Sequence, residues 1–145
     1  MPIAHPSPGV SVTVIVGDSF EKTVNQVTKS PVWYLDVRLE ADTSIDHPVP
    51  PAFNCFVHVL EGSPHICGQA SRAHGTVFLR RDGDVVNLEN RSGTSARTLL
   101  IAGDPLDGQE VVQRGPFVAT SQQGIRNAYS DYQTVSQAPR SAKCC

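Results

Sequence analysis

Residues 31–40 read PVWYLDVRLE, and this stretch carries the clearest pattern in the chain. Every second side chain from Trp33 to Leu39 is apolar, and the charged residues Asp36 and Arg38 stand between them. Successive side chains of a β-strand point to opposite faces of a sheet, so this alternation is typical of a strand with one buried face. We therefore predict a strand over Pro31–Glu40.

The segments on either side indicate further strands. Val10–Val16 alternates apolar and small polar side chains, and Gly17-Asp18-Ser19 is predicted to end that strand. Phe53–Leu60 is almost continuously apolar, which is typical of a strand buried on both faces. Shorter strands are predicted over His65–Gly68, Thr76–Arg80, Asp84–Glu89 and Ala96–Ala102.

Turn residues separate these segments. Asp82-Gly83 predicts a tight hairpin, because both residue types tolerate the positive φ that such a turn needs. Asp42–Pro51 contains three prolines, which lack a backbone donor, so this segment is predicted to be an irregular loop or a sheet edge. About seven short strands at this spacing indicate an all-β sandwich or barrel.

One helix is predicted near the C-terminus. Thr120 is its expected N-cap, and Gln123 follows three residues later, as in a capping box. Apolar side chains then recur at helical spacing, at Ile125, Ala128, Tyr129 and Tyr132. We expect the helix to lie against the outside of the barrel, within one domain over residues 10–133. An extended leader (1–9) and a disordered tail (134–145) are expected on either side.

Charge and cysteine content narrow the function classes. Twelve Lys and Arg against fourteen Asp and Glu give a net charge of −2, which argues against direct nucleic-acid binding. No apolar run reaches the roughly 18 residues of a membrane span, so an intracellular protein without membrane contact is expected. Cys55, Cys67, Cys144 and Cys145 match neither zinc spacing nor a disulfide framework. We interpret them as two partly buried thiols and two exposed, oxidisable tail thiols.

Four motifs in this chain resemble those of the pirin family. They are PVWYLDV (31–37), FVHVLEG (56–62), LLIAGDPL (99–106) and VVQRGPFV (111–118). Pirins are two-cupin proteins, and the chain resembles only their C-terminal half, over roughly Val10–Gln133. The resemblance implies a cupin-type antiparallel β-barrel, also called a double-stranded β-helix or jelly roll, with one C-terminal helix.

The resemblance also implies where a metal would bind. In pirins the first half carries the ligands, as a His-x-His pair after an Asp and a later His-x-Glu. This chain keeps Asp46-His47-Pro48, but Val49 stands in place of the second histidine, and His74, the last histidine, is followed by Gly75-Thr76. We therefore expect no catalytic residue, no cofactor and no metal ligand, with His47 the one weak candidate. A non-standard site would draw on His47, His58, His65 and His74.

Two functional hypotheses follow. The favoured one is a non-catalytic binding or regulatory module, because full pirins are implied to act in the nucleus as cofactors of transcription regulators. The alternative is a metal-dependent flavonol (quercetin) dioxygenase using iron or another transition metal, or the partner half of a split pirin enzyme. A chain encoding only the second barrel would expose an apolar face, so we expect a protein partner or self-association through it, in the nucleus or cytoplasm.

Overall fold

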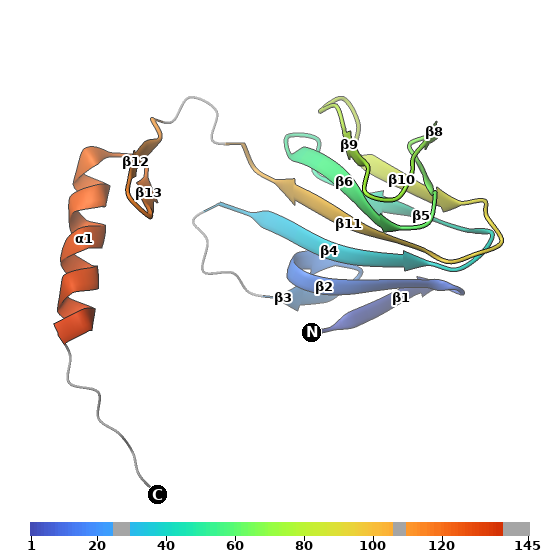
Figure 1. Ribbon diagram of the computed structural model, residues 1–145, viewed down its shortest axis with the longest axis horizontal. Helices are drawn as coiled ribbons and strands as arrows, with labels where there is room; N and C mark the ends of the chain where they lie inside the picture. The colour runs from blue at the N-terminus through green and yellow to red at the C-terminus, as the bar shows by residue number, and fades with distance from the viewer. Residues whose placement is uncertain (25–29, 106–109, 138–145) are drawn as a thin grey trace, which may run out of the picture. The chain divides into compact units, whose positions relative to one another are not determined.

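A computed structural model describes residues 1–24, 30–105 and 110–137 (Figure 1). The chain divides into two compact units, residues 1–105 and 106–145. The first unit is built from β-strands, and the second contains a short hairpin and the one helix among the described residues. An all-β, antiparallel fold with a single C-terminal helix is therefore confirmed, whereas one domain over 10–133 is not how the contacts divide the chain.

The first unit consists of two antiparallel sheets. The larger sheet has the strand order β1-β2-β4-β11-β6-β9, with β3 also paired to β2, and the smaller has the order β5-β10-β7-β8. The larger sheet comprises β1 (Ile3–Ser7), β2 (Val10–Ser19), β3 (Lys22–Val24), β4 (Val32–Leu39), β6 (Asn54–Glu61), β9 (Thr76–Phe78) and β11 (Ala96–Gly103). The smaller comprises β5 (Thr43–Pro48), β7 (His65–Ile66), β8 (Gln69–Ala70) and β10 (Val85–Asn90).

A single hydrophobic core joins the two sheets. In β4 the side chains of Leu35, Val37 and Leu39 are fully buried, which confirms the alternation read from the sequence. The smaller sheet adds Ile66 and Leu88, which lie opposite one another on β7 and β10. Each sheet therefore presents one apolar face to the core and leaves its other face outside.

The leader predicted for residues 1–9 is wrong. Residues Ile3–Ser7 form β1, which pairs with β2, and Ala4 is buried in the core. The chain can turn back here because Gly9 adopts a φ of +75°, a conformation that costs glycine little. The predicted strand end at Gly17-Asp18-Ser19 is also wrong, since β2 continues to Ser19 and its last residues pair with β3.

The structure also decides the conformation of two predicted turn segments, Asp82-Gly83 and Asp42–Pro51. Asp82-Gly83 makes no hairpin, because β9 pairs with β6 while β10 pairs with β5 and β7, so the segment crosses between the sheets. Neither residue has a positive φ, which the predicted turn would require. For Asp42–Pro51 the edge alternative is confirmed, since Thr43–Pro48 forms β5 at the edge of the smaller sheet.

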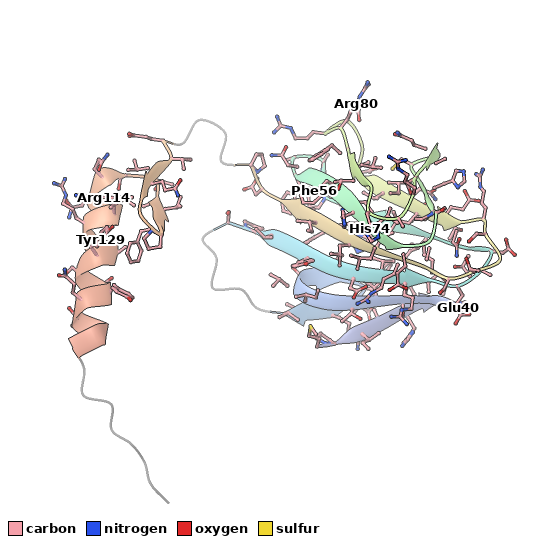
Figure 2. The ribbon with its side chains drawn as sticks, viewed as in Figure 1. Glu40, Phe56, His74, Arg80, Arg114 and Tyr129 are labelled. Atoms are coloured by element: carbon pink, nitrogen blue, oxygen red, sulfur yellow. The ribbon has the colours of Figure 1, made fainter. Side chains whose placement is uncertain are left out.

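The second unit places a hairpin against a helix. Its strands are β12 (Val112–Arg114) and β13 (Phe117–Ala119), and the helix is α1 (Gln122–Gln137). The Phe117 ring packs edge-on against the Tyr129 ring, with 4.8 Å between the ring centroids. The Cζ atom of Arg114 lies 5.9 Å from the centroid of the same tyrosine ring (Figure 2). Ile125 is buried.

The helix ends differ from their predicted positions. The backbone amide of Gly124 donates to Ser121 Oγ at 3.0 Å, so Ser121 is the N-cap rather than Thr120. The helix also continues through residues 134–137, so the tail predicted from Thr134 begins too early. The rest of that tail, with Cys144 and Cys145, lies outside the described residues. Within the described ranges no helix is long and apolar enough to span a membrane.

Candidate functional site

His47, the candidate metal ligand, lies inside the core of the first unit. It stands on β5 with only 1% of its surface exposed, and its Nε2 is 2.8 Å from Ser19 Oγ. The rings of Phe20 and Trp33 pack edge-on against the imidazole at centroid distances of 5.2 and 5.7 Å. The side chain is thus enclosed by β2, β4 and the residue that follows β2.

This enclosure favours the neutral imidazole. Burial lowers the pKa of His47, and the backbone of Pro48 offsets this only in part. Its second nitrogen, Nδ1, is buried, and no hydrogen bond of regular geometry reaches it. A buried polar atom without a regular hydrogen bond normally carries a cost, which a metal ion shared with neighbouring side chains would remove.

The residues around His47 do not fit a transition-metal centre. Such a centre needs several nitrogen, oxygen or sulfur donors converging on one point. The neighbouring Asp46 is exposed and accepts a hydrogen bond from Asn87 Nδ2 at 2.7 Å, while Val49, in place of the second histidine, is an apolar core residue. Across the described ranges, no three His, Cys, Asp or Glu side chains are grouped so that they could hold an ion.

The other histidines are held by separate elements. His58 lies on the half-exposed side of β6, where its Nδ1 is 2.8 Å from Thr76 Oγ1. His65 lies on β7 opposite Glu89 of β10. His74 occupies a loop with a φ of +64°, and its backbone amide donates to Val59 O at 2.7 Å (Figure 2).

A cavity of about 350 Å³ opens in the first unit. Its lining is mostly apolar, including Phe53 and Ile66, and it also contains Cys55, Cys67 and Arg80. The volume is within the range that small-molecule sites occupy. Burial, with a contribution from the charge of Cys67, raises the pKa of the Cys55 thiol to about 11, so this thiol is protonated at neutral pH.

The outer face of the larger sheet carries a row of apolar side chains. On four neighbouring strands, Tyr34, Ile101, Phe56 and Phe78 stand directly opposite one another. They alternate with core residues along their strands, so they point away from the core. The Phe56 and Phe78 rings are 5.6 Å apart, and Phe78, on edge strand β9, is 79% exposed. We call these four side chains the apolar row.

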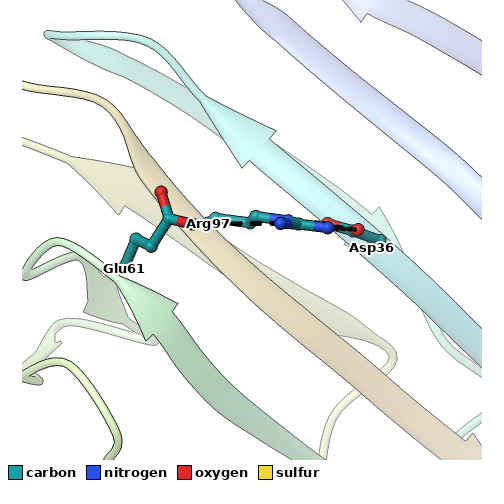
Figure 3. A network of polar contacts seen from close by, with 3 residues as sticks. All are labelled: Asp36, Glu61 and Arg97. Carbon is teal, nitrogen blue, oxygen red and sulfur yellow. Dashed lines mark hydrogen bonds and ion pairs between the residues drawn. The ribbon is translucent and has the colours of Figure 1, made fainter.

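Charged side chains stand on the same strands as the apolar row, and Figure 3 shows three of them, Asp36, Arg97 and Glu61. Arg97 of β11 donates through Nε and Nη2 to the carboxylate of Asp36 on β4, at distances from 2.6 to 3.2 Å. A second carboxylate, Glu61 of β6, lies 3.8 Å from the Arg97 guanidinium. Arg38, also on β4, is exposed and stands opposite Arg97. The face therefore combines an apolar strip with charges of both signs.

Comparison with known proteins places this geometry in a family context. The Pirin C-terminal cupin domain matches residues 34–137. Pirin-1 of Arabidopsis thaliana is 38% identical over 94% of this chain and 48% of its own length, and human Pirin is 31% identical over 93% and 47%. The chain thus spans about half the length of the curated relatives it matches.

Solved structures are similar to the chain over much of its length. Two crystal structures of quercetin 2,3-dioxygenase from Acinetobacter baumannii superpose with TM-scores of 0.69 and 0.68, at 24% and 26% identity. Each match covers 92% of this chain and about half of that protein, at 46% and 44%. Together with the family match, they confirm the cupin-type fold.

Proposed function

Since the chain belongs to the pirin family through its C-terminal cupin domain, we propose that it is a non-catalytic binding module that pairs with a second copy of itself. The observation that carries the proposal is the apolar row, which ends in the largely exposed Phe78. A large aromatic side chain on a sheet edge is costly to leave in water, and such exposed apolar patches mark interaction sites.

The charges beside the apolar row support a second copy as the partner. A two-fold dimer brings the same patch of each subunit together, so the patch must complement itself. Glu61 is largely exposed, and Arg38 is exposed on the same face. A two-fold axis through the apolar row can therefore set Glu61 of one copy near Arg38 of the other.

The exposed apolar face expected from the sequence has a concrete candidate in the outer face of the larger sheet, where the apolar row lies.

Sedimentation equilibrium of the full chain tests the proposal. We expect a monomer–dimer equilibrium at micromolar protein concentrations, which is typical of weak, specific interfaces. A monomer at every concentration up to the solubility limit would exclude it. Light scattering on the same samples separates a dimer from open-ended aggregation.

A regulatory role inside the cell completes this proposal. Pirin-like proteins are implied to assist transcription regulators, and the dimer would do so through protein contacts rather than by binding nucleic acid. Fluorescence microscopy of the tagged chain distinguishes the nucleus from the cytoplasm. Co-purification with a transcription regulator would support the role, and its absence under conditions that preserve the dimer would argue against it.

The second candidate function is one half of a metal-dependent flavonol dioxygenase. It is favoured by the 26% identity to a quercetin 2,3-dioxygenase structure. In that case a separate polypeptide would supply the metal site that His47 and its neighbours do not form. Consumption of quercetin by the purified chain, with iron, copper, nickel or manganese added in turn, tests activity of the chain by itself.

A further inference from the structure

Two cysteine side chains from different sheets line the same cavity. Cys55 belongs to β6 of the larger sheet and is buried, and Cys67 is exposed in the turn between β7 and β8 of the smaller sheet. The Cys67 amide donates to Asn87 O at 2.8 Å, which ties the turn to β10. The turn itself is tight, with φ values of +48° at Cys67 and +78° at Gly68.

The two thiols line the same cavity and differ in their access to solvent. Cys67 is open to solvent, whereas Cys55 is 8% exposed. Burial raises the pKa of the Cys55 thiol, and the charge of Cys67 adds to the rise. An exposed thiol paired with a second, enclosed thiol is the arrangement in which a peroxide-oxidised cysteine is resolved as a disulfide.

We propose that Cys55 and Cys67 are a peroxide-sensitive thiol pair that closes to a disulfide inside the cavity. The Cys67 thiolate attacks the O–O bond of a hydroperoxide, forms a sulfenic acid and releases water or an alcohol after protonation. The Cys55 sulfur then attacks the Cys67 sulfur, the S–O bond breaks, and the thiol proton of Cys55 leaves with the displaced hydroxide as water. Two thiols lose two hydrogen atoms in total, and the peroxide is reduced by two electrons.

The disulfide would join the two sheets at the cavity. It would connect β6 directly to the β7–β8 turn, elements that belong to different sheets. Both cysteines line the cavity, so the bond would narrow it and make ligand access depend on thiol oxidation. This inference does not rest on dimerisation, because neither cysteine belongs to the apolar row.

The test uses the full chain with Cys144→Ser and Cys145→Ser, which removes the tail thiols. The folded protein is treated with hydrogen peroxide, its remaining thiols are alkylated, and the peptides are analysed by mass spectrometry. One tryptic peptide, Leu39–Arg72, contains both remaining cysteines, and a further cut after Glu61 separates them. We expect the peptide Leu39–Arg72 to be two hydrogen atoms lighter than its fully reduced form. After the cut at Glu61, its two fragments should stay linked by the disulfide until a reductant is added.

Two variants give matched controls. Cys67→Asn keeps a residue type that tolerates the positive φ of the turn, and in this variant we expect Cys55 to stay reduced. Cys55→Ala removes the resolving sulfur, so we expect Cys67 to proceed to sulfinic acid. If Cys55→Ala does not fold, the full chain and Cys67→Asn still decide the question.

Other outcomes would overturn the proposal. A disulfide forms without backbone movement only where the two Cα atoms lie within about 7 Å, so the reaction itself reports the distance. Sulfinic or sulfonic acid at Cys67 with an unmodified Cys55 in the parent protein would show that the pair does not react. Disulfides formed only between chains, or only after denaturation, would contradict it as well.

Discussion

The substitution Phe78→Ser is the most informative test of the proposed dimer. Fully burying a phenylalanine side chain is worth about 1.5–3 kcal/mol. Phe78 is 79% exposed in the free chain, so roughly four-fifths of that energy, about 1.2–2.4 kcal/mol, is available when a partner covers it. A two-fold interface covers two such side chains, which gives roughly 2.4–4.8 kcal/mol per dimer.

The dimer dissociation constant is the quantity to measure. Because about 1.4 kcal/mol corresponds to a tenfold change, we expect Phe78→Ser to weaken the dimer by roughly fifty-fold or more. Folding stability should change by less than about 1 kcal/mol, since the side chain loses mainly its contact with Phe56. Sedimentation equilibrium gives the first value and urea unfolding of dilute protein the second.

A matched variant separates this effect from a general loss of exposed aromatic surface. Tyr132→Ser removes another exposed aromatic side chain, which is 64% exposed and stands on α1 outside the apolar row. We expect its dissociation constant to stay within about threefold of the parent value. Equal weakening by the two substitutions, or no weakening by Phe78→Ser, would refute the assignment of the dimer surface.

Three further substitutions test the core. Gly17→Ala should destabilise the protein by about 2 kcal/mol or more in urea unfolding, because Gly17 has a φ of +94° and the new Cβ would lie 2.3 Å from Trp33 Cδ1. The control Gly93→Ala, whose new Cβ has no atom within 4 Å, should be nearly neutral. Burial lowers the folded-state pKa of His47, so its contribution to the free energy of unfolding should be complete above pH 6.5 and decrease as the pH falls below that value. His47→Leu should weaken this dependence of the unfolding free energy on pH, and an unchanged dependence would assign it to other groups. Asn90→Ala should cost about 2 kcal/mol or more, because the buried amide donates to three carbonyl oxygens; a loss within experimental error would show that water replaces it.

The strands of the fold were predictable wherever the pattern is local. The alternation in residues 31–40 fixes the buried side of β4, because a period of two depends only on neighbouring residues. The pairing of Ile3–Ser7 with β2 was missed, because three prolines among the first nine residues suggested an extended leader. The crossing at Asp82-Gly83 depends on which strands pair, and turn residues do not encode that.

The candidate site was predictable only in part. His47 was singled out from its place after Asp46, but its contact with Ser19 joins residues 28 positions apart and is set by tertiary packing. The apolar run Phe53–Leu60 predicts a strand buried on both faces, yet β6 turns one side outward and places Phe56 in the apolar row. The row itself exists only through the register of four strands, which no single segment specifies.

The most direct test of the proposal that this cupin domain binds a partner and does not catalyse a reaction is its metal content. His47 is enclosed by Ser19 and two aromatic rings, and its neighbours offer no converging donors. Elemental mass spectrometry on the dialysed full chain should therefore find far less than one transition-metal ion per molecule, with no change in the His47→Leu variant. One iron, copper, nickel or manganese ion per chain that disappears in that variant would contradict a metal-free core.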